Sequence, residues 1–251
     1  MLNIVIPMAG AGSRFAQAGF IQPKPLIPIH NVPMIKVVIN NLRPKVEHRF
    51  IFIVQKKHVS QYDLITKLQS WSPGAIVIET EGLTEGAACT VLLAKKYIDN
   101  DNSLMIANSD QYIDCDIDDY LEELDRDSLD GLIMTMAADD PKWSFVGMGE
   151  HGYVTNVVEK QVISNEATVG IYNFKHGSDF VSAAEIMIDK NDRVNNEFYV
   201  APAYNYMIER NMKIGIYNIG SEANGMYGLG IPADLNLFLG LELSTKVTSG
   251  L

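Results

Sequence analysis

The sequence predicts an α/β protein with a Rossmann-like sheet that is mixed, mostly parallel and flanked by helices. In the first half of the chain, short apolar runs that suit buried strands alternate with segments of helical periodicity. The turns after those strands carry glycine, acidic and basic residues, and in a parallel sheet such turns meet at one edge. With 251 residues, 47% hydrophobic and 20% charged, the chain can bury the core of one large α/β domain.

Four strands are predicted in the first half, and helices connect them. The strands are Leu2 to Met8, Arg49 to Gln55, Ala75 to Glu79 and Asn102 to Asn108, and the helices are 31–42, 58–70 and the segment that follows the turn at 84–86. In the first helix Pro33 suits the first helical position, and Met34, Val37, Val38 and Leu42 share one face. Parallel strands joined by helices imply right-handed crossovers.

The second half contains more strands, which are less regularly interrupted by helices. The predicted strands are Gly131 to Ala137, Phe145 to Met148, Val154 to Glu159, Ala167 to Phe174 and Lys213 to Asn218, and the helices are Asp179 to Asp189, Tyr204 to Arg210 and Pro232 to Leu243. The turn Glu150-His151-Gly152 predicts a hairpin. Because no linker or repeat interrupts the chain, we expect a single domain over 1–251 with halves at about 1–130 and 131–251.

Charge and composition argue against several classes of partner. A net charge of −11 and a pI of about 4.9 disfavour a nucleic-acid backbone or an anionic membrane. No apolar run approaches the roughly 18 residues of a membrane span, and no signal-peptide pattern begins the chain, so we expect neither feature. Two cysteines, Cys89 and Cys115, favour a reducing cytoplasm, and the five histidines lack zinc spacing.

The turn after the first strand suits a polyphosphate. It contains Ala9, Gly10, Ala11, Gly12 and Ser13, and it is followed by Arg14. Glycines let main-chain N–H groups approach phosphate oxygens, and arginine adds a planar fork of donors. Lys24 adds a compact charge between two prolines. The Walker A and dinucleotide fingerprints do not fit this turn, and an ordinary strand-to-helix turn is the alternative interpretation.

The longer pattern, Ala-Gly-x-Gly-Ser-Arg-Phe and then Pro-Lys-Pro-Leu-Ile-Pro at 23–28, resembles the signature of the sugar-phosphate nucleotidyltransferases. The resemblance implies a GT-A-like fold and a Mg²⁺-dependent condensation of a nucleoside triphosphate with a small phosphomonoester, which releases pyrophosphate. It assigns the nucleotide to the first half and the acceptor phosphate to the second. The pattern most resembles that of bacterial enzymes that make precursors of capsule or other surface polysaccharides. Cytidylyltransferases that act on non-sugar phosphates belong to this group. Relatives of this kind often form homo-oligomers.

The resemblance implies roles for residues around the nucleotide. Arg14 and the loop amides would hold the β- and γ-phosphates, Lys24 would neutralise the α-phosphate, and Asp110, after Ser109 at the end of a strand, would hold Mg²⁺. Glu85 and Gly86 match a loop beside the base and ribose. Glu81 stands about where thymidylyl enzymes place a base-reading glutamine. Because a glutamate only accepts hydrogen bonds and cytosine offers an amino donor, Glu81 favours CTP over UTP or dTTP.

The resemblance also implies an acceptor site. Val-x-Glu-Lys at 157–160 matches a segment in which Lys160 would meet the acceptor phosphate and Glu159 its polar groups. Gly170 matches a glycine that faces the acceptor. Glu197 is a candidate acceptor contact or metal-site residue. For Glu159 and Lys160, a strand end with two solvated charges is the alternative interpretation.

One departure and one rival motif leave other functions open. The family's second metal-binding aspartate is replaced by Gly228, so Glu197 or Asp234 would have to complete the metal shell, or Asp110 would act with phosphates and water. Asp234 also suits the first turn of a helix. Asp114 and Asp116 form an Asp-x-Asp, which in glycosyltransferases binds a metal and elsewhere is a solvated acidic stretch. A GT-A-type glycosyltransferase and a non-catalytic nucleotide-binding protein are therefore the alternatives.

Overall fold

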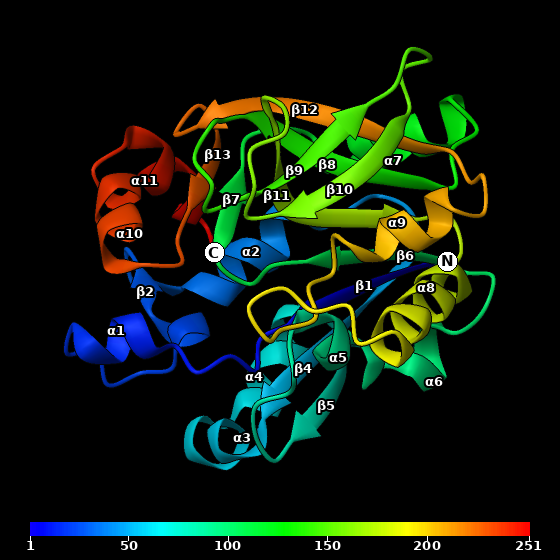
Figure 1. Cartoon of the computed structure of the whole chain (residues 1–251). Helices are drawn as coiled ribbons and strands as arrows, with labels where there is room; N and C mark the ends of the chain where they lie inside the picture. The colour runs from blue at the N-terminus through cyan, green and yellow to red at the C-terminus, as the bar shows by residue number, and fades with distance from the viewer.

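The structure, a computed structural model, describes all 251 residues and is built on one mixed sheet of eleven strands (Figure 1). Its main path runs in the order β5-β4-β1-β6-β11-β8-β12-β13-β7, and β9 and β10 form a hairpin beside β11. The strands are β1 (Leu2–Pro7), β4 (His48–Gln55), β5 (Ile76–Thr80), β6 (Ser103–Ala107), β7 (Gln111–Ile113), β8 (Gly131–Ala137), β9 (Ser144–Met148), β10 (Val154–Glu159), β11 (Glu166–Phe174), β12 (Ile214–Glu222) and β13 (Gly225–Gly228).

The first half of the sheet is parallel and the second half is mixed. β5, β4, β1 and β6 run parallel, as the alternation of strands and helices predicts. β11 then pairs antiparallel with both β6 and β8, while β12 returns parallel to β8. The predicted α/β class with a Rossmann-like sheet is therefore confirmed, and the β6–β11 ladder joins the two halves of the chain into one sheet.

Helices cover both faces of the sheet and lie at its ends. They are α1 (Ser13–Gln17), α2 (Met34–Asn41), α3 (Lys56–Tyr62), α4 (Leu64–Trp71), α5 (Ala87–Leu92), α6 (Lys95–Ile98), α7 (Ile117–Arg126), α8 (Gly177–Asp189), α9 (Ala203–Ile208), α10 (Pro232–Leu239) and α11 (Glu242–Thr248). A 3₁₀ turn (Lys24–Leu26) and the short strands β2 (Pro28–Ile29) and β3 (Val32–Pro33) lie between α1 and α2. None of the helices combines the length and apolar character needed to span a bilayer.

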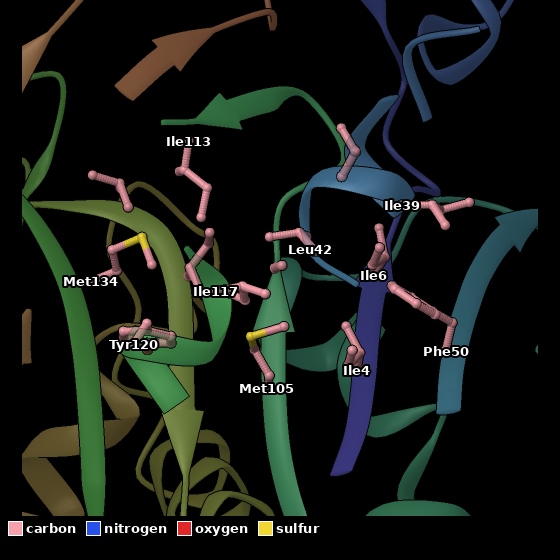
Figure 2. Close-up of a cluster of buried hydrophobic side chains, with 14 of the residues drawn as sticks. Ile4, Ile6, Ile39, Leu42, Phe50, Met105, Ile113, Ile117, Tyr120 and Met134 are labelled. Atoms are coloured by element: carbon pink, nitrogen blue, oxygen red, sulfur yellow. The ribbon is translucent and has the colours of Figure 1, made fainter. Parts of the chain in front are cut away.

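Alternation along each strand divides the core into two layers. Ile4 and Ile6 of β1 pack with Phe50 of β4 in a cluster of 30 buried residues that α2, α4 and α7 cover (Figure 2). Val5, which lies between them, belongs to a second cluster of 28 residues on the opposite face, under α5, α8 and α9. Because successive side chains of a strand point to opposite faces, a continuous apolar strand is buried on both sides.

Several predicted elements differ from the structure. The predicted helix 58–70 is two helices, because Asp63 adopts a left-handed conformation with φ 50° between α3 and α4. The predicted helix 232–243 is also two, separated at Gly240. Pro33, expected inside a helix, stands before it with the extended ψ of 135°. The short strands β7 and β13, which pair with each other, were not predicted.

Candidate active site

The predicted nucleotide loop lies where the direction of the strand order changes. β1 and β6 are adjacent parallel strands, and the strands of this sheet that follow them in the chain lie in opposite directions along the strand order, β4 beyond β1 and β7 and β8 beyond β6. Ligands of open α/β sheets bind beyond the carboxyl ends of such strands. The turn after β1 and the segment after β6 border a cleft of about 220 Å³, which is lined by Pro7, Met8, Gly10, Lys24, Pro25, Asn108, Ser109 and Asp110.

A buried glutamine that sequence reasoning missed fixes the turn after β1. Gln55, the last residue of β4, donates from Nε2 to the carbonyl oxygens of Ala9 (2.6 Å) and Gly10 (3.1 Å). The N–H groups of Gly10, Ala11 and Gly12 donate to no backbone carbonyl. Two carbonyl oxygens of the turn therefore accept hydrogen bonds from Gln55, while its N–H groups have no backbone acceptor. Free main-chain N–H groups of this kind can bind an anion. A polar residue that ends an otherwise apolar strand was the available signal.

Lys24 and Asp110 meet across this cleft. The Lys24 ammonium lies 2.7 Å from Asp110 Oδ2, and both side chains are about three-quarters buried, with exposed fractions of 25% and 23%. Lys24 begins the 3₁₀ turn between two prolines, which restrict its backbone. On the other side of Asp110, a Cβ on Gly230 would stand only 2.5 Å from Oδ2. The absent side chain at Gly230 lets the main chain approach the carboxylate.

Arg14 lies in a second and larger cleft that shares Asp110. This cleft has a volume of about 700 Å³, and its lining includes Arg14, Asp110, Gln111, Lys142, Trp143, Lys160, Gly228, Gly230 and Asp234. Phe15, the neighbour of Arg14, is buried in a third apolar cluster with Leu235 and Phe238 of α10. This packing brings α1 against α10. The structure thus brings Arg14, Lys24, Asp110 and Lys160 to one connected region.

Asp234 occupies the space beside the glycine that replaces an aspartate. A Cβ on Gly228 would lie 3.1 Å from Asp234 Oδ2, so the carboxylate of α10 fills the place where a side chain at 228 would begin. Burial raises the pKa of Asp234, as do the charges of Glu222 and Asp110, while Lys142 and Arg14 oppose the rise. Asp234 also lies in the first turn of α10, as the helix interpretation expects.

The predicted acceptor residues form a neighbouring cluster. Glu159 ends β10 and accepts a hydrogen bond from the Ser144 hydroxyl. Burial raises its pKa, and Lys160 opposes the rise. The Lys160 ammonium lies 5.5 Å from the centroid of the Tyr199 ring, and burial together with Glu197 and Glu159 raises the pKa of Tyr199 to about 12. Two carboxylates, one ammonium and one phenol therefore share this region.

The three residues predicted to lie near the base, Glu81, Glu85 and Gly86, differ in their surroundings. Glu81 is exposed, and Lys56 pairs with it at 2.6 Å. Glu85 pairs with Arg193, whose guanidinium lies 4.2 Å from the centroid of the Phe198 ring. Gly86 packs directly on Phe198, since a Cβ there would lie 2.5 Å from the Phe198 nitrogen. The loop at 84–86 is thereby joined to the segment that carries Glu197.

The remaining predicted residues are Ser13, Ser109 and Gly170. Ser109 is buried beside Asp110, and Ser13 is the exposed first residue of α1. Gly170 of β11, predicted to face the acceptor, lies against the side chains of Asn108 and Gln111. Its carbonyl oxygen accepts a hydrogen bond of 3.0 Å from the N–H of Asn108, the residue after β6. A Cβ at Gly170 would collide with Asn108.

The rival Asp-x-Asp has a structural use. Asp116 is the N-cap of α7, where its Oδ1 accepts from the Asp118 N–H at 2.9 Å. Lys45 lies 3.8 Å from Asp116 Oδ2. Asp114 is at the opposite end of β7 from Asp110. No group of three or more His, Cys, Asp or Glu side chains is arranged to hold a metal ion, here or elsewhere.

Comparison with known proteins identifies relatives of the whole chain. The family model described as Nucleotidyl transferase matches residues 4–212. A "Bifunctional protein GlmU" from Methanococcus vannielii is 27% identical over 244 residues, which cover 93% of this chain and 53% of the relative. The chain therefore spans about half the length of the curated relatives it matches.

Two solved structures resemble the fold over nearly its full length. The nucleoside-diphosphate-sugar pyrophosphorylase from Vibrio cholerae RC9 superposes with a TM-score of 0.81 at 25% identity, covering 95% of this chain and 100% of that one. The inositol-1-phosphate CTP transferase from T. maritima gives 0.71 at 17% identity, with 99% and 97% covered. The second likeness concerns the fold alone.

Proposed function

The chain belongs to the nucleotidyl transferase family, and from this premise we propose that it joins a nucleoside triphosphate to a phosphomonoester and releases pyrophosphate. The observation that carries the proposal is the convergence of Arg14, Lys24 and Asp110 on connected clefts beyond β1 and β6. An oxygen of the acceptor phosphate attacks the α-phosphorus in line, and the bond to the β-phosphate oxygen breaks. The attacking oxygen is already anionic, so no general base is needed, and catalysis consists of positioning and charge neutralisation.

The proposed roles follow from position. The free amides of the turn after β1 and the Arg14 guanidinium hold the β- and γ-phosphates. Lys24 leaves Asp110 and neutralises the charge that develops at the α-phosphate. Lys160, in the cleft that contains Arg14, holds the acceptor phosphate. Glu159 and Glu197 contact the polar groups of the acceptor.

The donor set at Asp110 fits Mg²⁺. Magnesium prefers oxygen ligands and is commonly held by one or two carboxylates together with substrate phosphates and water. Asp110 supplies one carboxylate, and the Lys24 ammonium already stands at Oδ2 where a cation is favoured. Asp234, beside Gly228 and in the same cleft, or Glu197 would supply a second, or Asp110 would act with phosphates and water alone. When bound, the ion neutralises phosphate charge and fixes the geometry of the triphosphate.

We also propose which nucleotide base the protein prefers and how its product is used. Glu81 favours CTP, provided that it exchanges Lys56 for the cytosine amino group. The product would be an activated precursor for a capsule or other surface polysaccharide, made in the cytoplasm by a homo-oligomer of this chain.

A two-dimensional screen tests the proposal. Four nucleoside triphosphates are combined with sugar, polyol, amino-alcohol and organic-acid phosphates in the presence of Mg²⁺, and pyrophosphate is measured. We expect release with CTP and at least one acceptor, and loss of release in Asp110→Asn. A clear preference for UTP or dTTP would remove the role of Glu81. Nucleotide binding without turnover across the whole panel would support a non-catalytic protein.

A further inference from the structure

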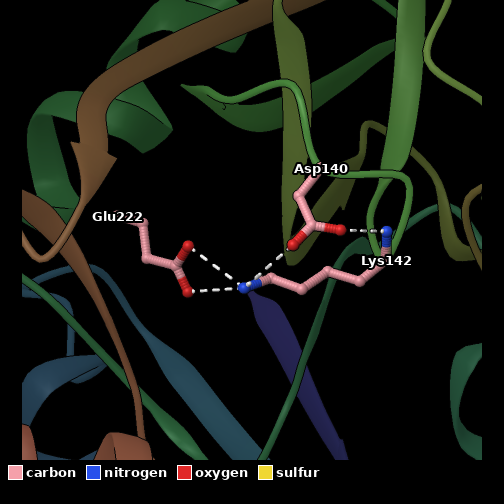
Figure 3. A network of polar contacts seen from close by, with 3 residues as sticks. All are labelled: Asp140, Lys142 and Glu222. Carbon is pink, nitrogen blue, oxygen red and sulfur yellow. Dashed lines mark hydrogen bonds and ion pairs between the residues drawn. The ribbon is translucent and has the colours of Figure 1, made fainter.

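Two lysines line the 700 Å³ cleft, and they differ in what holds their ammonium groups. Figure 3 shows the Lys142 ammonium between two carboxylates, at 2.9 and 3.1 Å from the two oxygens of Glu222 and 3.7 Å from Asp140 Oδ2. Lys160 takes part in none of the ion pairs of the protein. Its ammonium lies over the ring of Tyr199, 5.5 Å from the centroid. Carboxylates therefore engage Lys142, and an aromatic ring engages Lys160.

An aromatic ring orients a cation without cancelling its charge. The negative face of the ring attracts an ammonium group that lies within about 6 Å of the centroid, but the ring has no net charge. Burial, together with Glu197 and Glu159, raises the pKa of Tyr199 to about 12, so the phenol stays neutral at physiological pH. A phosphate that approaches Lys160 therefore has no ion-paired carboxylate to displace.

The main chain beside the Tyr199 ring is held in place through Phe198. The Phe198 side chain is 1% exposed and belongs to the buried cluster under α5, α8 and α9. The Phe198 N–H donates to the Glu85 carbonyl at 2.8 Å, and the Phe198 carbonyl accepts from the Ala88 N–H at 3.0 Å. The segment that carries Tyr199 is thus fixed to the loop at 84–88, and the ring starts from an anchored position.

The side chain of Lys160 needs a restraint because only its main chain is fixed. Lys160 has a left-handed φ of 56°, and its N–H donates to the Trp143 carbonyl at 3.0 Å. Its side chain is exposed, and a lysine ammonium stands on a flexible stem of four carbons. The contact with the Tyr199 ring restrains the far end of this stem.

We propose that Tyr199 is a positioning residue whose ring holds the Lys160 ammonium in the cleft and leaves its charge free for the phosphate of the acceptor. The inference rests on the proposed function, because it takes Lys160 to bind that phosphate. Tyr199 itself need touch neither substrate. The ring carries the effect and the hydroxyl does not, so phenylalanine should replace tyrosine here and an aliphatic residue should not.

Lysine signals in NMR spectra of the full chain test the inference without turnover. Lysine is labelled with ¹³C at Cε, and the signal that K160R removes is assigned to Lys160. Because an aromatic ring shifts the signals of nearby protons, the Lys160 signal should move in Y199L and keep its position in Y199F. Inorganic phosphate is the probe for the acceptor phosphate, and it should shift the Lys160 signal. The Kd from this titration should rise about fivefold in Y199L and less than about twofold in Y199F.

Lys96 and Tyr97 provide a matched control. They form another lysine–tyrosine pair, with the ammonium 4.6 Å from the ring centroid, and neither lines the clefts of the candidate site. Y97L should move the Lys96 signal, which K96R assigns, and should leave the phosphate Kd at Lys160 unchanged. Y199M, which also lacks a ring, repeats the test if circular dichroism shows that Y199L does not fold.

Three results overturn the inference. They are a Lys160 signal or a phosphate Kd that is the same in Y199L as in the unaltered protein, a loss in Y199F as large as that in Y199L, and a Lys160 signal that phosphate does not shift. Failure of the proposed function is a different result, in which no combination of substrates releases pyrophosphate although the Lys160 signal responds to phosphate and to the Tyr199 ring.

Discussion

At the scale of single residues, we expect Lys24 to affect the rate of the reaction and not the affinity for the nucleotide. The Lys24 ammonium is assigned to charge that develops at the α-phosphate, so Lys24→Ala should lower kcat by about 100-fold or more. The Kd for the nucleoside triphosphate should change by less than about threefold, since the ground state is held mainly by the turn after β1 and Arg14. Pyrophosphate release and calorimetric titration measure the two quantities. Lys246→Ala, on α11, serves as a control. An unchanged kcat would exclude Lys24 from the reaction.

Glu159 makes stability depend on pH. Burial raises its pKa above the ordinary value of 4.5. The folded state therefore binds this proton more tightly than the unfolded chain does. Its contribution to the free energy of unfolding is fully present below pH 4.5 and is lost as pH rises through the raised pKa. Glu159→Gln should remove this part of the slope in urea unfolding, which lies at pH values from 4.5 upward. A difference between the two proteins that is constant with pH would contradict the assignment.

At the scale of elements, the start of α7 tests the rival motif. Asp116 caps this helix, so Asp116→Ala should lower the free energy of unfolding by about 1 kcal/mol. Pyrophosphate release by the folded variant should be unchanged, because Asp116 caps α7 and does not line the cleft. Asp114→Ala, which removes no cap, should leave both quantities unchanged. A tenfold loss of activity in either variant would restore Asp-x-Asp as a metal motif.

A second prediction concerns the loop at 84–86, which packs on the segment after α8. Gly86 has φ 133°, a conformation that side chains rarely adopt, and a Cβ would approach the main chain of Phe198. Gly86→Ala should therefore lower the free energy of unfolding by about 2–4 kcal/mol. Gly82→Ala, in the same loop with no atom within 4 Å, is the matched control. Equal urea midpoints for the two variants would show that the loop moves freely.

The same elements show how far the sequence can be read. β1, β8 and β10 were predicted almost to the residue, because continuous or alternating apolar runs record burial directly. β7 and β13 are three and four residues long and exist because they pair with each other, and the break at Asp63 depends on one left-handed residue. The β7–β13 pair joins segments that are distant in the chain, and the left-handed conformation belongs to Asp63 alone. The spacing of apolar residues records neither feature.

For the candidate site, the predictable residues were those with local signals. Arg14, Lys24 and Asp110 lie next to glycine, proline and strand-end signals, and the structure brings them together. Gln55 was missed because its importance arises from the hydrogen bonds that it makes to the turn after a neighbouring strand. The roles of all these residues remain predictions for the experiments above.

At the scale of the whole molecule, the β6–β11 ladder should make unfolding a single transition. Ile171 pairs with Ala107 and Phe174 with Leu104, so one sheet crosses both halves. The two tryptophans report on the halves separately, Trp71 from α4 and Trp143 from the turn before β9. In W143F and in W71F, the fluorescence transition in urea should coincide with the circular dichroism transition. Separate midpoints would show that the halves unfold as independent domains.

The pairing of Lys24 with Asp110 has a consequence for how substrates arrive. Without ligands, the two opposite charges neutralise each other inside a strongly acidic protein. A polyanion that arrived alone would draw the ammonium away and leave a carboxylate facing more negative charge. A polyanion that arrives with a divalent cation would replace the Lys24–Asp110 pair with two pairs of opposite charges. One joins Lys24 to a phosphate, and the other joins Asp110 to the cation. Under the proposed function, the resting pair would therefore favour entry of the nucleotide as its metal complex.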